Sequence, residues 1–422
     1  MISLKKLRNE TENCKKRLLL KQKDVDLNSI LDLDEKLRKL KTVSNDMRAK
    51  RNSASEAIGN LKKAGKDVTD SINETRELGE ELKKLEEELN TISKDLEEHL
   101  YRLPNLPHQS VPRGVDESGN QEVRSWGDKP EFTFDPRSHL EIGEELGLFD
   151  FQRGAKLSGS GFPLYMGEGA KLERFLINAM IQYHEEEFGF IEVFPPVLMK
   201  KESMLTTGQL PKFEEDMYHT EVDNLYLAPT AEVPVTNIHR DEIINESDLP
   251  IYYVAYSPCF RRESGSYGKD TRGLLRVHQF NKVELVKFTA PENSYDELEF
   301  LTNQAESILQ KLGLHYRVVE LCTGDLSFAA AKCYDLEVWA PGEQKWLEVS
   351  SCSNFESFQA RRGNIRYRDS SNNNVQFLHT LNGSGVATPR LMAALIETYQ
   401  TEEGIIVFPE YVADFLGIQE IS

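Results

Sequence analysis

The sequence lacks the patterns that define several common classes of protein. Its five cysteines never form a Cys-x-x-Cys pair, which argues against a structural zinc site and against a secreted disulfide framework. It contains no run of about 18 apolar residues, so no membrane span is expected. The N-terminus has no apolar signal core, and it carries acidic residues that a transit peptide would avoid. A cytoplasmic location is therefore expected.

The common nucleotide-binding and hydrolytic motifs are missing as well. Neither Gly-x-Gly-x-x-Gly nor a Walker A sequence occurs, which excludes the usual Rossmann and P-loop sites. No Ser/His/Asp or Cys/His constellation indicates a protein nucleophile. The 422 residues are enough for two or more domains, and the segments after residue 135 alternate without a βαβ rhythm. This favours an α+β fold with an antiparallel sheet flanked by helices.

Charge is distributed unevenly along the chain. The net charge is −19, yet residues 1–66 hold 18 Lys and Arg against 9 Asp and Glu. Residues 67–100 hold 4 against 12, and the remaining residues hold 29 against 49. An acidic body with one basic N-terminal region suits an RNA partner that is gripped locally.

Apolar residues in the N-terminal region recur at alternating steps of three and four, which predicts a heptad seam. In its first half the seam positions are Ile30, Leu33, Leu37, Leu40, Ser44, Met47, Arg51, Ala54, Ile58 and Leu61. After a break at Gly65 the pattern resumes at Val68, Ser71, Thr75, Leu78, Leu82, Leu85, Leu89, Ile92 and Leu96. We expect an antiparallel coiled-coil hairpin over about 27–100, within an N-terminal domain of residues 1–103. Residues 104–134, rich in proline, predict an extended linker to a domain of residues 135–422.

The segment 258–285 predicts two strands joined by a long basic loop that contains glycine. Arginines stand at the base of this hairpin and in its loop, and the guanidinium fork matches two phosphate oxygens. Phe280, on the return strand, offers a flat face for a base. A solvated hairpin with ordinary surface charges is the alternative, and the whole string makes it the weaker interpretation.

This segment, PCFRRESGSYGKDTRGLLRVHQFNKVEL, closely resembles motif 2 of class II aminoacyl-tRNA synthetases in the form found in seryl-tRNA synthetases of the bacterial type. Residues 172–196 resemble motif 1, the helix and strand of the class II dimer interface. Residues 379–397 resemble motif 3, a strand, a glycine-rich turn and a helix with Arg390 in its first turn. The resemblance implies a homodimer that activates serine with ATP and transfers the seryl group to the terminal adenosine of tRNA(Ser).

The resemblance also implies an ATP site without a protein nucleophile. Arg261 is expected at the α-phosphate, Glu263 and Phe280 at the adenine, and Arg272 and Arg390 at the β- and γ-phosphates. Glu348 and Ser351 offer the oxygen ligands that suit Mg²⁺ and do not suit zinc. The implied catalytic residues are Arg261, Glu263 and Arg390, and the implied ATP site is Arg261, Arg262, Glu263, Arg272, Phe280, Glu348, Val349, Ser350, Ser351 and Arg390.

The segment 226–234 resembles the Thr-x-Glu loop that holds serine in the same family. The implied serine pocket consists of Thr230, Ala231, Glu232, Glu284, Thr380 and Ser384. For the coiled-coil arm the resemblance implies contact with tRNA, and the candidate residues are Lys36, Arg38, Lys39, Lys41, Arg48, Lys50, Arg51, Lys62 and Lys63. Pairing between the two helices is another use for these charges. The sequence leaves open whether a selenocysteine tRNA is also charged.

Three alternatives remain. A threonyl or prolyl enzyme of class II is the nearest, although a threonyl enzyme would need a Cys/His zinc site. A carrier-protein amino-acid ligase would lack the long arm. A non-catalytic RNA-binding relative would be expected to have lost Arg261, Glu263, Glu348 or Arg390, and all four are present.

Overall fold

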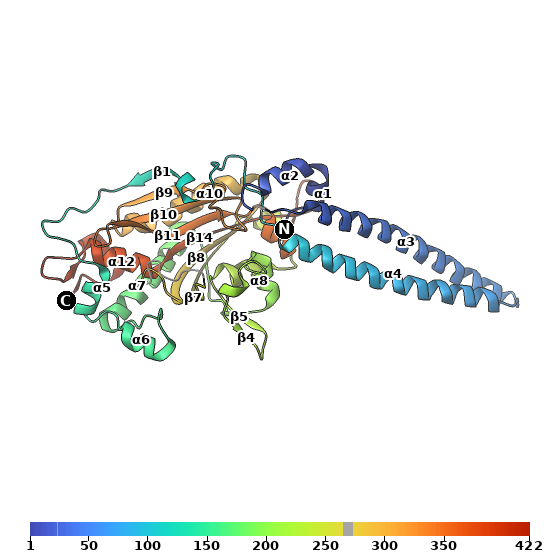
Figure 1. Ribbon diagram of the computed structural model, residues 1–422, viewed down its shortest axis with the longest axis horizontal. Coiled ribbons are helices and arrows are strands. Elements are labelled where there is room, and N and C mark those ends of the chain that lie inside the picture. The colour runs from blue at the N-terminus through green and yellow to red at the C-terminus, as the bar shows by residue number, and fades with distance from the viewer. Residues whose placement is uncertain (23, 265–272) are drawn as a thin grey trace. The chain divides into compact units, whose positions relative to one another are not determined.

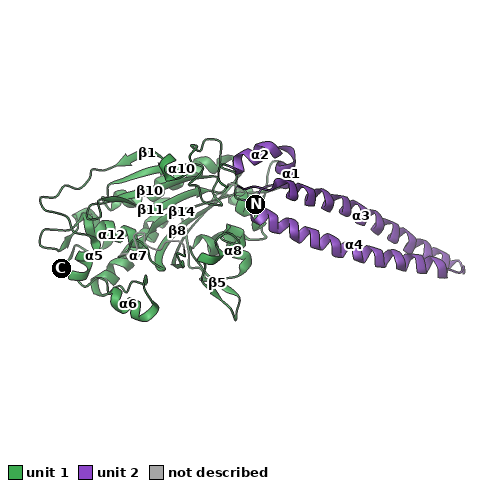
Figure 2. Ribbon diagram, in the orientation of Figure 1, with its two compact units in different colours: residues 1, 20–22, 104–422 green, residues 2–19, 23–103 purple. Residues whose placement is uncertain are grey.

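The computed structural model describes residues 1–22, 24–264 and 273–422. The chain divides into two compact units (Figure 2), which are residues 2–19 with 23–103, and residue 1 with 20–22 and 104–422. The predicted ATP-site residue Arg272 lies outside the described residues. In the part of the chain that is described, no helix has both the length and the apolar character needed to cross a membrane.

The smaller unit is helical, and its two long helices form the hairpin that the heptad pattern predicts (Figure 1). Its helices are α1 (Leu4–Asn9), α2 (Thr11–Leu18), α3 (Leu27–Lys63) and α4 (Thr69–Tyr101). Asp26 caps α3 by accepting a hydrogen bond from the Ser29 amide at 3.1 Å. Gly65, with φ +70°, provides the left-handed backbone that the turn after α3 requires.

Burial along the hairpin follows the predicted seam in the part of each helix that lies away from the turn. It weakens toward the turn. Ile30, Leu37, Leu82 and Ile92 are buried. Arg51, a polar residue that interrupts the seam, is exposed. After Ser44 no residue of α3 is buried.

The predicted tRNA-binding cations of the arm fall into two groups. One group is paired within the arm, namely Lys36 with Glu88, Arg38 with Asp34, Lys39 with Glu35 and Arg48 with Glu86. The other group is exposed and forms no salt bridge to any described residue, namely Lys41, Lys50, Arg51, Lys62 and Lys63. The second group therefore has its full charge available to a partner.

The larger unit is built on an eight-stranded sheet with the order β1-β9-β10-β11-β14-β8-β7-β2. Neighbouring strands are antiparallel, as predicted, except for the parallel pair β2 and β7. The strands are β1 (Gln121–Trp126), β2 (Ile191–Val193), β7 (Ile251–Phe260), β8 (Gln279–Thr289), β9 (Tyr316–Glu320), β10 (Lys332–Ala340), β11 (Lys345–Asn354) and β14 (His379–Ala387). Residues 121–126, which composition placed in a linker, thus form the edge strand of this sheet.

Helices cover one face of the sheet and enclose the main hydrophobic core (Figure 1). The three that pack on the central strands are α7 (Gly167–Phe188), α10 (Ser294–Lys311) and α12 (Thr388–Thr398). The others are α5 (His139–Glu145), α6 (Phe151–Ser158), α8 (Lys201–Thr207), α9 (Glu232–Thr236), α11 (Phe358–Arg362) and α13 (Glu410–Leu416). On the opposite face a second hydrophobic cluster with residues of α9 and α11 covers part of β7 and β8, and residues of β8, β11 and β14 are left to form a site.

Small sheets complete the unit. They contain β3 (Leu198–Met199), β4 (His219–Thr220) and β5 (Leu225–Leu227), then β6 (Ile243–Asn245), β12 (Arg366–Arg368) and β13 (Val375–Phe377), and finally β15 (Ile406–Val407) with β16 (Glu420–Ile421). The glycine-rich turn expected before α12 is instead part of β14. A Cβ on Gly383 would lie 2.9 Å from the Cys352 sulfur, so glycine is needed there for packing inside the sheet.

Candidate active site

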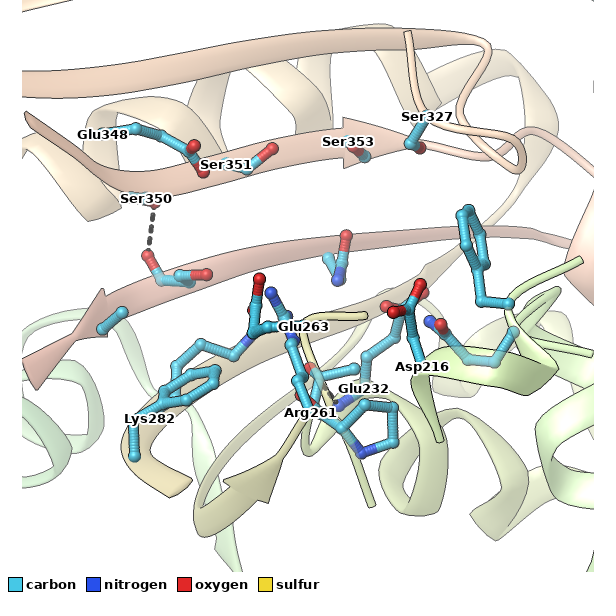
Figure 3. A pocket seen from close by; sticks show the side chains of 18 of the residues that line it. Asp216, Glu232, Arg261, Glu263, Lys282, Ser327, Glu348, Ser350, Ser351 and Ser353 are labelled. Carbon is cyan, nitrogen blue, oxygen red and sulfur yellow. Dashed lines mark hydrogen bonds between the residues drawn. The ribbon is translucent and has the colours of Figure 1, made fainter. Parts of the chain in front are cut away.

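A cavity of about 740 Å³ opens on the sheet face opposite the covering helices (Figure 3). It is lined by residues from β8, β11 and β14, from the start of α12 and from the segments around 207–217, 229–232, 261–263, 274–277 and 327–329. Eleven of the predicted ATP- and serine-site residues line it, which are Thr230, Glu232, Arg261, Glu263, Phe280, Glu348, Val349, Ser350, Ser351, Ser384 and Arg390. Segments far apart in the sequence therefore meet in one place.

Arg261 and Phe280 form one wall of the cavity. They are brought together by the antiparallel pair β7 and β8, in which Cys259 lies opposite Phe280. The guanidinium carbon of Arg261 lies 5.1 Å from the centre of the Phe280 ring, and its Nε donates to the Pro229 carbonyl at 3.3 Å. The guanidinium group is thus held at the base of the hairpin with its terminal nitrogens toward the cavity (Figure 3).

Glu263 and Arg262 differ in position although they are adjacent. Glu263 lines the cavity and accepts from Arg276 at 2.8 Å, with its backbone in the left-handed region at φ 50°. The amide of Arg262 donates to the Asp216 carbonyl at 2.9 Å, and its side chain is not part of the lining. The structure therefore brings Glu263 into the site and leaves Arg262 beside it.

An irregularity in β11 explains how Glu348 and Ser351 reach the same cavity. Residues three apart on a regular strand face opposite sides. Here Glu337 of β10 pairs with Glu348 while Leu336 pairs with Ser350, so Val349 has no partner and forms a β-bulge. The bulge shifts the alternation by one residue and turns both oxygen-bearing side chains to one face (Figure 3).

Arg390 lies beside these residues at the first turn of α12. Its Nη1 donates to the Glu348 carbonyl at 2.8 Å and lies 3.4 Å from the Glu348 carboxylate. Its Nε donates to the Leu275 carbonyl at 3.2 Å. With Pro389 at the helix start, this corner combines a cation with a helix N-terminus, an arrangement suited to an anion.

The opposite end of the cavity is polar and buried. Glu284 is fully buried, and it accepts from Thr230 at 2.8 Å, from Asn382 at 3.0 Å and from Lys282 at 2.5 Å. Thr230, Asn382 and Lys282 line the cavity, whereas Glu284 stands behind them. The carboxylate thus acts on the cavity through its three partners.

A second buried carboxylate, Glu232, lines the same end. It accepts from the Gln359 amide at 2.6 Å, and the oxygen of that amide accepts from Thr380 at 2.7 Å. Burial, and secondly the nearby charge of Glu284, raise the pKa of Glu232 to about 7. The free protein near neutral pH therefore contains both protonation states of this group.

Three predicted serine-site residues do not line the cavity. Thr380 and Glu284 are buried behind the lining, and Ala231 belongs to a separate hydrophobic cluster. Lys282 and Asn382 were missed, although strand alternation could have found them, because they stand between predicted residues at 280, 284, 380 and 384. Gln359 and Arg276 had no comparable signal in the sequence.

Comparison with known proteins agrees with this geometry. Residues 1–107 match the family model of the seryl-tRNA synthetase N-terminal domain, and residues 212–399 match that of the tRNA synthetase class II core domain (G, H, P, S and T). The serine–tRNA ligase of Geobacter sulfurreducens is 52% identical, with all of both chains covered. That of Carboxydothermus hydrogenoformans is 53% identical over 100% of this chain and 99% of its own.

A solved structure extends the match to three dimensions. The seryl-tRNA synthetase from Pyrococcus horikoshii, crystallised as a complex with ATP, superposes with a TM-score of 0.91 at 37% identity. The superposition covers 100% of this chain and 99% of that one. Two family models, relatives that match over the full length and a solved structure with the same architecture all agree. The chain therefore belongs to the seryl-tRNA synthetase family.

Proposed function

We propose that this protein is a serine–tRNA ligase that forms seryl-adenylate from L-serine and ATP and transfers the seryl group to the 3′-terminal adenosine of tRNA(Ser). The observation that carries this function is the single cavity in which Arg261, Glu348 and Arg390 face a buried polar pocket. The full-length similarity to serine–tRNA ligases supports the same activity.

In the first step an oxygen of the serine carboxylate attacks the α-phosphorus of ATP, and pyrophosphate leaves. No protein nucleophile is needed, because positioning and charge neutralisation lower the barrier. Arg261 neutralises charge at the α-phosphate, and Arg390 binds the outer phosphates. Phe280 stacks on the adenine ring, and Glu263 accepts a hydrogen bond on the adenine side.

Glu348 and Ser351 fit a magnesium site. Both are oxygen donors, and the bulge at Val349 turns both toward the cavity, with Glu348 half exposed. When bound, Mg²⁺ would neutralise negative charge on the triphosphate. Glu348 also anchors Arg390, through its backbone carbonyl at 2.8 Å and its carboxylate at 3.4 Å, so the same residue orders the cation of the phosphate site.

The buried end of the cavity suits serine. Glu232 provides an anion for the substrate ammonium, and Thr230 provides a hydroxyl whose orientation Glu284 fixes. Ser384 lies at the same end, and Thr380 holds Gln359, which in turn holds Glu232. A pocket whose polar groups hydrogen-bond the serine hydroxyl rejects alanine, because alanine would leave those groups unpaired.

In the second step the 3′-hydroxyl of the tRNA attacks the carbonyl of seryl-adenylate, and AMP leaves. The N-terminal domain, residues 1–103, binds the tRNA. Its phosphate contacts are the arm cations that form no salt bridge to a described residue, namely Lys41, Lys50, Arg51, Lys62 and Lys63. Changing Lys62 and Lys63 together to alanine should lower aminoacylation severalfold and leave pyrophosphate exchange unchanged. An equal fall in both assays would contradict this role. The same aminoacylation assay, run with a selenocysteine tRNA, would show whether that tRNA is also charged.

The active enzyme is a homodimer in the cytoplasm. The edge strand β2 and the segment after it expose Ile191 and Phe194, at 58% and 78% of their surface. Apolar residues on an edge strand are typical of an interface. Sedimentation should give a particle of two chains, and Phe194→Asp should shift it toward one.

Amino-acid-dependent exchange of labelled pyrophosphate into ATP tests the activity directly. Serine should support exchange, and threonine, alanine and proline should not. Exchange with threonine or proline alone would assign the chain to another class II activity. No exchange with any amino acid would favour a non-catalytic RNA-binding protein.

A further inference from the structure

Glu397 is a buried carboxylate outside the proposed site. It lies on α12 seven residues after Arg390, which places it two helical turns further along the same face. Its Oε1 accepts from the amide of His139 at 2.9 Å and from Nδ1 of the same residue at 2.7 Å. Its Oε2 accepts from the amides of Gly342 at 2.9 Å and Glu343 at 3.1 Å. Both oxygens are therefore fully used.

This arrangement fixes the state of the His139 ring, which is 1% exposed. The Leu274 amide can only donate, and it points at Nε2 at 3.3 Å, so Nε2 is the acceptor. Nδ1 therefore carries the ring hydrogen and donates it to Glu397. Gly273 has φ +63°, and a Cβ on it would lie 2.5 Å from Nε2, so only glycine lets the chain approach this ring.

The stretch 274–276 is held at three consecutive residues by three parts of the fold. His139 accepts from the Leu274 amide, Arg390 donates to the Leu275 carbonyl at 3.2 Å, and Glu263 pairs with Arg276 at 2.8 Å. All three residues line the cavity. Two of the three holding groups belong to the proposed ATP site, whereas His139 does not.

His139, Glu343 and Glu397 are also close enough together to be considered as a cation site. The hydrogen bonds argue against that use. Backbone amides point at both oxygens of Glu397, and the Leu274 amide points at the free nitrogen of His139. A cation would face these donors, so the cluster is better explained as a set of hydrogen bonds that holds the surrounding backbone in place.

We infer that His139, held by Glu397, positions the stretch 274–276 for ATP binding through its bond to the Leu274 amide. It links α12, which carries Arg390, to the backbone that Arg390 itself contacts. His139 is a positioning residue, because it acts through Leu274 and does not line the cavity. The expected change in the KM for ATP rests on the proposed function, whereas the expected exchange of the Leu274 amide rests on the geometry alone.

Two substitutions of His139 separate its two hydrogen bonds. In His139→Asn the side-chain amide can still donate to Glu397 but cannot reach Leu274. In His139→Gln the side-chain oxygen reaches the position of Nε2 and can accept from Leu274. We expect His139→Asn to raise the KM for ATP about fivefold with the KM for serine unchanged, and His139→Gln to stay within about twofold of wild type for both. His239→Asn is the matched control, because His239 also bonds a carboxylate, at 2.8 Å from Glu242, away from the cavity.

Hydrogen–deuterium exchange of the Leu274 amide supplies a readout that does not depend on activity. It should be slow in the wild-type protein and in His139→Gln, and faster in His139→Asn. Equal defects in both variants, or a rise in both KM values, would overturn the inference. If His139→Asn does not fold, an unprotected Leu274 amide in the wild type, or a raised KM for ATP in His139→Gln, would overturn it. A wild-type protein without serine-dependent exchange would refute the proposed function and leave the exchange measurement standing.

Discussion

The two ends of the cavity are organised in opposite ways. At the end proposed to bind serine, here called the serine end, Lys282 and Glu284 lie 2.5 Å apart with side chains 8% and 0% exposed. At the end proposed to bind ATP, here called the ATP end, Arg390 and Glu348 lie 3.4 Å apart with side chains 31% and 48% exposed. The ion pair at the serine end is therefore buried, whereas the one at the ATP end is partly open to water.

This difference suits the ligand that is proposed for each end. Serine differs from alanine by one hydroxyl, and discrimination at that scale requires buried polar groups that are left unpaired by the wrong substrate. A triphosphate offers several negative charges, so exposed cations can bind it and lose their water in doing so. We therefore expect selectivity to depend on the buried network and charge neutralisation to depend on the exposed one.

The largest expected effect is at the ATP end. Arg261→Ala should lower serine-dependent pyrophosphate exchange about 10³-fold, because it removes the charge at the reacting phosphate. Arg262→Ala is the matched control, since its side chain does not line the cavity, and should stay near the wild-type rate. Equal losses in the two variants would mean that the cavity does not define the ATP site.

A paired test of Glu284 and Glu348 addresses the comparison directly. Glu284→Gln breaks a buried ion pair and should lower the free energy of unfolding by about 3 kcal/mol and kcat/KM for serine about 100-fold. Glu348→Gln breaks an exposed pair and should change the free energy of unfolding by less than about 1 kcal/mol, while ATP binding weakens. Urea unfolding and steady-state kinetics measure both. Similar unfolding energies for the two variants would remove the contrast between the two ends.

Stacking should contribute less than charge. Phe280→Leu keeps an apolar side chain but removes the flat face, and we expect the KM for ATP to rise about tenfold. Phe377→Leu is a suitable control, because Phe377 packs against Arg361 at 4.5 Å outside the cavity. An unchanged KM for ATP in Phe280→Leu would move the adenine elsewhere.

The smallest effect concerns pH. Since the pKa of Glu232 is raised to about 7, lowering the pH from about 7 to about 6 should protonate most of it and reduce kcat/KM for serine about fivefold. The free energy of unfolding changes in the opposite direction. In the native state Glu232 keeps a proton that it releases in the unfolded chain above its ordinary pKa of 4.5. Glu232 thus lowers stability as the pH rises toward 7. Glu232→Gln should flatten both profiles, and an unaltered serine profile in that variant would contradict the assignment.

Local pattern was sufficient to predict much of this molecule. The heptad spacing predicted α3 and α4, and the alternation around Phe280 predicted the pair β7 and β8. Both signals depend on neighbours in the sequence. The gathering of Arg261, Glu348 and Arg390 was predicted from family resemblance, since no local rule connects residues so far apart.

What the sequence could not supply depends on pairing between distant strands. The bulge at Val349 exists only relative to its partner strand β10, and the bond from Gln359 to Glu232 joins residues 127 positions apart. The strand β1 was predicted as linker because its partner β9 lies nearly 200 residues later.

The bulge in β11 has a consequence for how such chains are compared and engineered. Inserting one residue between Leu336 and Glu337 of β10 would give Val349 a pairing partner and would leave every residue of β11 in place. The insertion would restore regular alternation in β11, so Glu348 and Ser351, which are three residues apart, would face opposite sides of the sheet. Comparison of the β11 sequence alone would not reveal this change.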